Sequence, residues 1–185
     1  IEACHARDIL CPIYITVQWD HYTARRHSEW LCIDESGCQV GTRPFEAGFY
    51  RRLCLNTPYV DFLAEHTTEV LTRFDCDGFF FDMTFWPHVC VCPYCRAKYR
   101  HETGREIPRT VDWRSPDWCA FQSARERWMT EFAGELSACV KALRPGVTAY
   151  HNFATALFSW RQGVSFASAV HHDFLGADFY GDPLE

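Results

Sequence analysis

The stretch from Asp77 to Arg100 constrains the fold more than any other part of the chain, because it joins a buried strand, a carboxylate and a cysteine cluster. Phe79 to Phe81 is apolar throughout, as expected for a strand covered on both faces, and Asp82 follows it directly. Barrels of the α/β class keep their chemistry at the carboxyl ends of such strands. Three cysteines with the C-x-C-x-x-C spacing of a structural metal clip come next: Cys90, Cys92 and Cys95. Together the strand-end carboxylate and the cysteine cluster favour an enzyme over a binding module.

Composition excludes several classes of protein. The chain has 185 residues, enough for one domain with a sizeable core, and 48% of them are hydrophobic. Its net charge of −6 and the lack of a basic run argue against nucleic acid. No apolar run approaches the ~20 residues of a membrane span. The aromatic share of 16% fills a core and also mildly favours a flat ligand such as a sugar ring. The 11 cysteines are scattered, which predicts a cytoplasmic protein with one metal clip and several buried thiols.

Strands and helices alternate along the chain, and this order predicts a parallel sheet with outer helices. Helices are expected from Thr57–Pro58 to Phe74, from Tyr94 to Glu102 and from Ser115–Pro116 to about Arg144. Long loops follow the strands and short loops follow the helices, as in a barrel whose strand-end loops build a site. We therefore predict the α/β class and a partial (β/α)8 (TIM) barrel. Its predicted strands are Ile13–Gln18, Phe79–Phe81, Val147–Tyr150 and Phe174–Phe179.

Both ends of the chain predict a piece of a longer barrel. Residues 1–7 resemble the last turns of a helix, and Gly181 to Glu185 come just after a predicted strand. We expect residues 1–185 to form a single (β/α)8-barrel domain that lacks the first and last barrel strands. A homo-oligomer would then form through regions outside this piece.

The cysteine cluster predicts a zinc site. Thiolates are soft ligands, and four of them favour tetrahedral Zn²⁺ in a structural role. The clustered cysteines leave one ligand to be found, and His88 is a local candidate. The competing interpretation is a redox pair formed by Cys92 and Cys95. It leaves the third cysteine unexplained, so we favour the metal.

Several motifs together resemble a known family. The run from Cys54 to Tyr59, the strand that ends in Asp82 and the loop from Cys90 to Arg96 are similar to barrel domains of the hypothetical glycosyl hydrolase 6 family. The segments Trp19–Tyr22 and Ala177–Glu185 fit the same picture. Those domains are related to α-L-fucosidases and to β-galactosidases with a trimerisation domain. The resemblance implies a glycoside hydrolase that cleaves glycosidic bonds of a carbohydrate substrate.

A narrower resemblance concerns the metal. Family 42 β-galactosidases hold a structural zinc with one cysteine before a helix and three in a C-x-C-x-x-C loop after the following strand. Cys54 matches the first of these positions, which implies Cys54 as the fourth ligand beside Cys90, Cys92 and Cys95. The strand end departs from the pattern, because family 42 carries Asn-Glu there and this chain carries Asp82-Met83. A fucosidase-like aspartate nucleophile suits Asp82 better.

Glycoside hydrolysis normally uses two carboxyl groups, so Asp82 needs a catalytic partner. Asp178 ends another predicted strand and is the candidate, with Asp20, Glu185 and a residue outside the chain as alternatives. Each candidate also has a plainer structural interpretation, in which a carboxylate or amide caps a loop and an aromatic ring packs in the barrel. The candidate substrate-binding residues all follow predicted strands: Trp19, Asp20, His21, His151 and Asn152.

Two other functions stay open. A catalytically inactive barrel that binds carbohydrate would keep the aromatic residues and the zinc but lack one carboxylate. A zinc-stabilised interaction module would instead present the Cys loop to a protein partner as an exposed apolar patch. A second acidic residue within ~5–10 Å of Asp82 separates a hydrolase from the inactive barrel.

Overall fold

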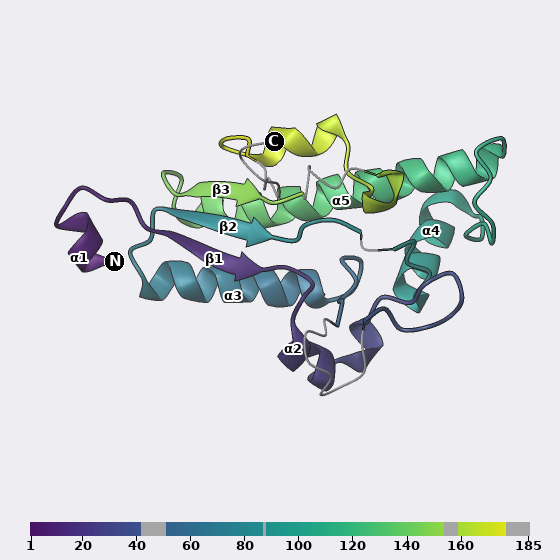
Figure 1. Cartoon of the computed structure of the whole chain (residues 1–185), viewed down its shortest axis with the longest axis horizontal. Coiled ribbons are helices and arrows are strands. Elements are labelled where there is room, and N and C mark those ends of the chain that lie inside the picture. Colours follow the sequence, from purple (N-terminus) through teal and green to yellow (C-terminus); the bar gives the residue numbers. More distant parts are fainter. Residues whose placement is uncertain (42–50, 87, 154–158, 177–185) are drawn as a thin grey trace, which may run out of the picture.

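The centre of the molecule is a sheet of parallel strands. The computed structural model describes residues 1–41, 51–86, 88–153 and 159–176. Its strands β1 (Pro12–Thr16), β2 (Gly78–Asp82) and β3 (Thr148–His151) form a parallel sheet in the order β1-β2-β3 (Figure 1). The parallel pairing predicted for these strands is confirmed, and the Phe-rich strand is the central one. Their carboxyl ends therefore lie along one edge of the sheet.

Two long helices connect the strands and pack side by side (Figure 1). α3 (Tyr59–Arg73) lies between β1 and β2 in the chain, and α5 (Pro116–Leu143) lies between β2 and β3. This alternation is that of an α/β protein with a parallel sheet, as predicted. Shorter elements lie before β1, between the strands and after β3: α1 (Glu2–His5), α2 (His21–Arg26), η1 (Ser28–Trp30), α4 (Pro93–Thr103), η3 (Trp160–Gln162) and η4 (Phe166–His171).

Local sequence sets the helix ends close to their predicted positions. Pro116 occupies the first turn of α5, where a backbone N–H would have no partner within the helix. α4 ends at Gly104, whose φ of 70° is a left-handed conformation that glycine adopts without strain. α3 begins slightly later than predicted. Pro58 takes its N-cap position, and the Thr57 hydroxyl accepts a 3.3 Å hydrogen bond from the Tyr59 N–H.

The strand register separates two faces of the sheet. Phe81 and His151 are paired in register and are 0% and 1% exposed, because the helix layer covers them. Tyr14 and Phe80 are paired on the opposite face, where their rings stack with centroids 5.7 Å apart and Tyr14 is 59% exposed. In a closed barrel this second face would line the interior. Asp82, two residues after Phe80, belongs to this second face.

α5 reaches well beyond the sheet. Its 28 residues make it about 42 Å long, whereas the four residues of β3 span about 13 Å. Its second half packs on β3, and its first half extends to α4, where Tyr99 makes edge-to-face ring contacts with Phe121 at 5.1 Å and with Trp128 at 6.4 Å. Of the helices in the described ranges, α5 included, none combines the length and the apolar character that a membrane span needs.

The fourth predicted strand, Phe174–Phe179, lies partly outside the described residues, which end at residue 176, and Asp178 is among those outside. For the described part the strand prediction is wrong, because residues 174–176 are irregular. Just before them, the Asp173 carboxylate accepts the Ala149 N–H at 2.7 Å, and the Asp173 N–H donates to the Ala149 carbonyl at 3.1 Å. The Asp173 side chain thereby accepts a hydrogen bond from a backbone N–H of β3 that would otherwise be available to a neighbouring strand.

Gly78 leaves no room for a side chain in the central strand. A β-carbon there would lie 2.2 Å from Thr148 Oγ1 on β3, and threonine is stiff at χ1. We expect Gly78→Ala to lower the free energy of unfolding by about 1–3 kcal/mol, as overpacking does, in urea denaturation. Adding Thr148→Ala should recover most of that loss. Gly146→Ala is the matched control, because a β-carbon there meets nothing within 4 Å. Equal stability of the Gly78 and Gly146 variants would contradict this packing.

Candidate functional site

Asp82 ends β2, and residues from both neighbouring strands hold its side chain. The Tyr14 hydroxyl of β1 donates to Asp82 Oδ2. Asn152 follows β3, and its Nδ2 donates to Asp82 Oδ1 at 2.7 Å, while the Met83 N–H donates to the same oxygen at 2.9 Å. The aspartate is only partly buried. A carboxylate that is both oriented and accessible can act as a nucleophile or in proton transfer.

The backbone turns sharply at the same edge. Met83 has a φ of 67° and Gln18, after β1, has a φ of 66°, in the left-handed region that non-glycine residues rarely adopt. Buried Gln18 donates from Nε2 to the Phe85 carbonyl at 2.6 Å, so the loops after β1 and β2 are bonded together. The Thr84 N–H donates to the Asn152 carbonyl at 3.0 Å, which adds the loop after β3. Such strained positions persist where surrounding contacts fix them, and they are common at functional sites.

The residues predicted after β1 lie around the start of α2. Asp20 is the N-cap of that helix: its Oδ1 accepts the Thr23 N–H at 2.9 Å, and its Oδ2 accepts the Thr23 hydroxyl. His21 is the first residue of the helix. The Trp19 ring lies under the guanidinium of Arg52, 4.6 Å from its centroid. Asp20 therefore has the capping role of its plainer interpretation, and substrate binding by these residues stays a prediction.

The two residues predicted after β3 point in different directions. Asn152 turns to Asp82, whereas the buried His151 faces α5, where its Nε2 lies 2.9 Å from Ser137 Oγ. Because Ser137 Oγ donates to the His171 carbonyl at 2.8 Å, it accepts from His151, which assigns the proton to Nε2. His151 joins β3 to the helix layer and does not line the edge that carries Asp82.

The predicted metal ligands converge in space. The sulfur atoms of Cys54, Cys90, Cys92 and Cys95 all lie within 4.8 Å of one another, and all four residues are buried. The Cys54 and Cys95 sulfurs are 3.4 Å apart. A tetrahedral ion with bonds of ~2.3 Å to sulfur has ligands ~3.8 Å apart, so this group could hold one metal ion after small shifts. His88, the local alternative, is exposed and lies outside the group.

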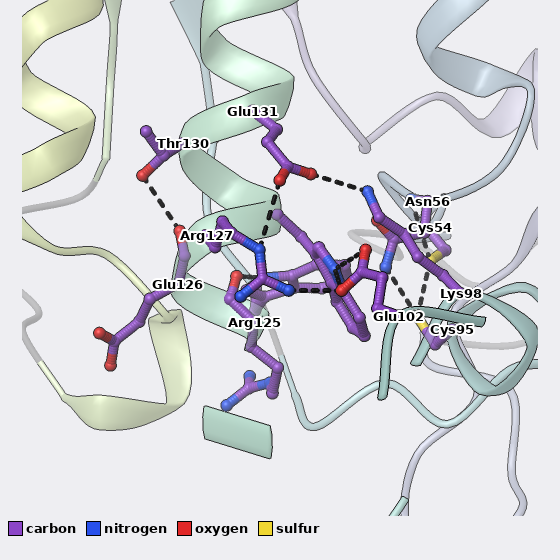
Figure 2. A network of polar contacts seen from close by, with 12 residues as sticks. Cys54, Asn56, Cys95, Lys98, Glu102, Arg125, Glu126, Arg127, Thr130 and Glu131 are labelled. Carbon is purple, nitrogen blue, oxygen red and sulfur yellow. Dashed lines mark hydrogen bonds and ion pairs between the residues drawn. The ribbon is translucent and has the colours of Figure 1, made fainter. Parts of the chain in front are cut away.

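The cysteines come from separate segments and share a polar surrounding. Cys54 precedes α3, Cys90 lies in the loop after β2, and Cys92 and Cys95 lie at the N-cap and in the first turn of α4. Asn56 donates to two of the sulfurs, from its N–H to Cys54 at 3.4 Å and from Nδ2 to Cys95 at 3.3 Å (Figure 2). These donors and the positive end of α4 both stabilise negative sulfur, which suits thiolate ligands.

Ionisation of more than one thiol in the cluster is unfavourable without a cation. Burial raises the pKa of the Cys54 and Cys95 thiols well above the usual value. The pKa of Cys90 is lowered, because neighbouring thiols, Cys32 first and Cys54 next, hydrogen-bond to it. A bound metal cation would offset the burial of several thiolates at once.

Cys32 is a further buried thiol at this cluster that the sequence patterns did not indicate. It is 0% exposed, and its thiol interacts with those of Cys54 and Cys90. It stands alone in the sequence, outside any motif. The antiparallel bridge between Leu31 and Leu53 helps to bring it to the cluster, and no local sequence pattern predicts that pairing.

Arg125 is a buried cation beside the cluster. It lies on α5, is 1% exposed, and donates to the carbonyls of His88 at 3.1 Å and Arg161 at 2.6 Å. Burial lowers its pKa to about 10, and the nearby Cys95 and Cys90 act in the opposite direction. An arginine in the apolar pattern of a helix gives no sequence signal of this role. A buried positive charge favours an anionic partner, such as a metal ion bound by four thiolates.

A polar network joins α4 to α5 next to the cluster (Figure 2). Lys98 donates to Glu131 at 2.9 Å, and Trp128 Nε1 donates to Glu102 at 2.9 Å. Arg127 pairs with the same Glu102. These contacts hold the first half of α5 against the helix that carries two of the clustered cysteines.

Sequence comparison finds a similarity to a family model over the first part of the chain. Residues 1–83 match the family model of hypothetical glycosyl hydrolase 6. The matched segment includes β1, α3 and β2 and therefore contains Asp82. The predicted resemblance to this family is confirmed for that segment. A comparison with curated proteins finds no match.

Solved structures share the fold. An α-L-fucosidase, isoenzyme 2 from Paenibacillus thiaminolyticus, is 28% identical with a TM-score of 0.63, over 82% of this chain and 22% of its own. The β-galactosidase from Rahnella sp. R3 is 16% identical with a TM-score of 0.68, over 97% of this chain and 30% of its own. That of the psychrophilic Marinomonas ef1 is 13% identical with a TM-score of 0.72, over 100% and 34%. The neighbours have TIM-barrel folds, and this chain spans between 22% and 34% of their lengths.

The buried state of His151 predicts acid sensitivity. Burial lowers the pKa of His151 from 6.5 to about 3, and His172 and His171 add to the shift. Between these values the unfolded chain binds a proton that the folded chain does not. Stability should therefore fall as the pH drops from about 6.5 towards 3, by up to about 1.4 kcal/mol per pH unit. Urea denaturation at several pH values measures this slope.

His151→Gln should flatten the slope, because the titrating group is gone. The matched control is His101→Gln at an exposed histidine, which should leave the slope unchanged. A slope that persists unaltered in the His151 variant would assign the acid sensitivity to other groups.

Proposed function

We propose that this chain is part of a (β/α)8-barrel glycoside hydrolase and that Asp82 is its catalytic nucleophile. The observation that carries the proposal is the setting of Asp82, which ends the central parallel strand on the face opposite the helices. Bonds from Tyr14 and Asn152 orient its carboxylate. The family match across this strand and the fold shared with glycosidases support it. Candidate substrates are α-L-fucosides and β-galactosides, after the names of the similar structures.

The residues at the carboxyl edge of the sheet would have separate roles in glycoside hydrolysis. One Asp82 oxygen would attack the anomeric carbon while an acid protonates the departing glycosidic oxygen, and water would then hydrolyse the glycosyl ester. Asp178, outside the described residues, is our candidate for the acid and base. Trp19 could stack on the sugar, and the sugar hydroxyls could bind Asp20, His21 and Asn152. His151 would act by positioning β3.

We assign the four-cysteine group to a structural Zn²⁺. Soft sulfur donors favour zinc over Mg²⁺ or Ca²⁺, and four protein ligands leave no open position for substrate. The buried thiols, the Asn56 donors and the Arg125 cation fit such a centre. The ion would fix the loop after β2 against the starts of α3 and α4. All the cysteines are free thiols, which supports a reducing compartment such as the cytoplasm.

Asp82→Asn tests the nucleophile, because it keeps the size of the side chain and removes the charge. We expect turnover of aryl α-L-fucosides or β-D-galactosides to fall by at least about 10³-fold, since no covalent intermediate can form. Zinc content and melting temperature should stay nearly unchanged. The matched control is Asp112→Asn in an exposed loop, which should keep full turnover. A parallel loss of stability and activity in the Asp82 variant would assign Asp82 to loop capping instead.

Azide rescue separates catalysis from mere binding. In Asp82→Gly, azide should enter the vacated space, restore part of the turnover and yield a glycosyl azide of inverted configuration. A wild-type protein that binds a glycoside in calorimetry without cleaving it would favour the inactive carbohydrate-binding barrel.

The metal assignment has its own test. We expect one zinc per chain in elemental analysis of the purified protein. Chelation should lower the melting temperature by at least about 5 °C, because binding energy at a structural site is folding energy. If the protein is purified without zinc and its melting temperature does not change when zinc is added, the assignment of a structural metal is wrong.

A further inference from the structure

Cys32 shares one side of a short antiparallel pairing with Cys54. Leu31 and Leu53 form an antiparallel bridge, the Cys32 N–H donates to the Arg52 carbonyl at 2.8 Å, and the Cys54 N–H donates to the Trp30 carbonyl at 2.8 Å. Side chains alternate between the two sides of paired segments, so Cys32 and Cys54 both lie on the side opposite the two leucines.

The cysteine loop approaches the same segment from the other direction. The Val91 N–H donates to the Ile33 carbonyl at 2.7 Å, which places Cys90 next to the segment that carries Cys32. The Cys32 thiol accordingly interacts with both the Cys54 and the Cys90 thiols. With 0% exposure it faces the cluster and is closed off from solvent.

A tetrahedral centre needs only four of these five sulfurs. The group whose sulfurs all lie within 4.8 Å of one another contains Cys54 and Cys90 but not Cys32. Cys32 is thus a fifth buried cysteine beside a group that already supplies four ligands. A buried cysteine that lies on the same side of the pairing as Cys54, next to the loop that carries Cys90, is placed to serve as a ligand when one of the four is missing.

We propose that Cys32 is a reserve metal ligand that replaces Cys54 or Cys90 when either is lost, so that the ion keeps four sulfur ligands. The proposal rests on the metal site proposed above. When Cys54 or Cys90 is missing, the Cys32 thiol would give its proton to water and its thiolate would bind the metal at the open position. No electrons are transferred. The side chain of Arg125 keeps the surroundings favourable for a dianionic centre in either arrangement.

Cobalt substitution measures the number of sulfur ligands, because the sulfur-to-Co²⁺ charge-transfer absorption grows with each thiolate bound. Cys54→Ala should retain one metal per chain and the absorption of four thiolates. Cys32→Ala/Cys54→Ala should show the weaker absorption of three thiolates and bind zinc at least about tenfold less tightly. Cys54→Ala/Cys76→Ala is the matched control, since Cys76 is also 0% exposed but precedes β2, and it should behave like Cys54→Ala alone.

Cys54→Ser, which keeps the volume of the side chain, repeats the test without a cavity. Three-thiolate absorption in both Cys54 single variants, or their failure to fold with zinc present, overturns the reserve role, because an intact centre should preserve the fold. Wild-type protein that binds neither cobalt nor zinc overturns the metal site and this inference together. Metal binding by the wild-type protein, together with three-thiolate absorption in both Cys54 single variants, overturns only the inference.

Discussion

The pairing of β2 between two parallel strands is the constraint on which the rest of the structure depends. Its register brings a tyrosine from one neighbour and an asparagine from beyond the other to the same carboxylate, so Asp82 is held by residues about 70 positions away on each side. The close contact between Gly78 and Thr148 shows how little freedom that pairing leaves. Because a parallel sheet places every strand end at one edge, the fold itself gathers the polar residues there.

The cysteine cluster gives order to the part of the chain that the sheet does not organise. Among the described residues, the chain forms no strand between β2 and α4, and between β1 and α3 it forms short helices and isolated bridges. Thiols from both connections meet in one buried group. Hydrophobic burial alone is non-directional, whereas four sulfur ligands around one ion fix distances and angles. A metal there would give two irregular loops a defined geometry.

Prediction from sequence succeeded where a pattern was local. The Phe-rich strand, the proline start of α5 and the cysteine spacing each depend on neighbouring residues, and the structure contains all of them. It missed Cys32 and Arg125, because their roles arise from pairing between distant segments. It also placed His151 and Asn152 together at the substrate edge. Because side chains alternate along a strand, one of the two faces the helices instead, and that residue is His151. The irregular Phe174–Gly176 segment differs from its strand-like composition because Asp173 already occupies the edge of β3.

The length of α5 gives the molecule a mechanical property. One helix carries Arg125 beside the cysteine cluster and Ser137 beneath His151, twelve positions and about 18 Å apart. A helix is stiff over that distance, so a rotation or shift of α5 at Arg125 would also move Ser137. His151 adjoins Asn152 in the chain, and Asn152 bonds to Asp82. A displacement of the cysteine cluster would therefore reach the Asp82 carboxylate through α5, His151 and Asn152.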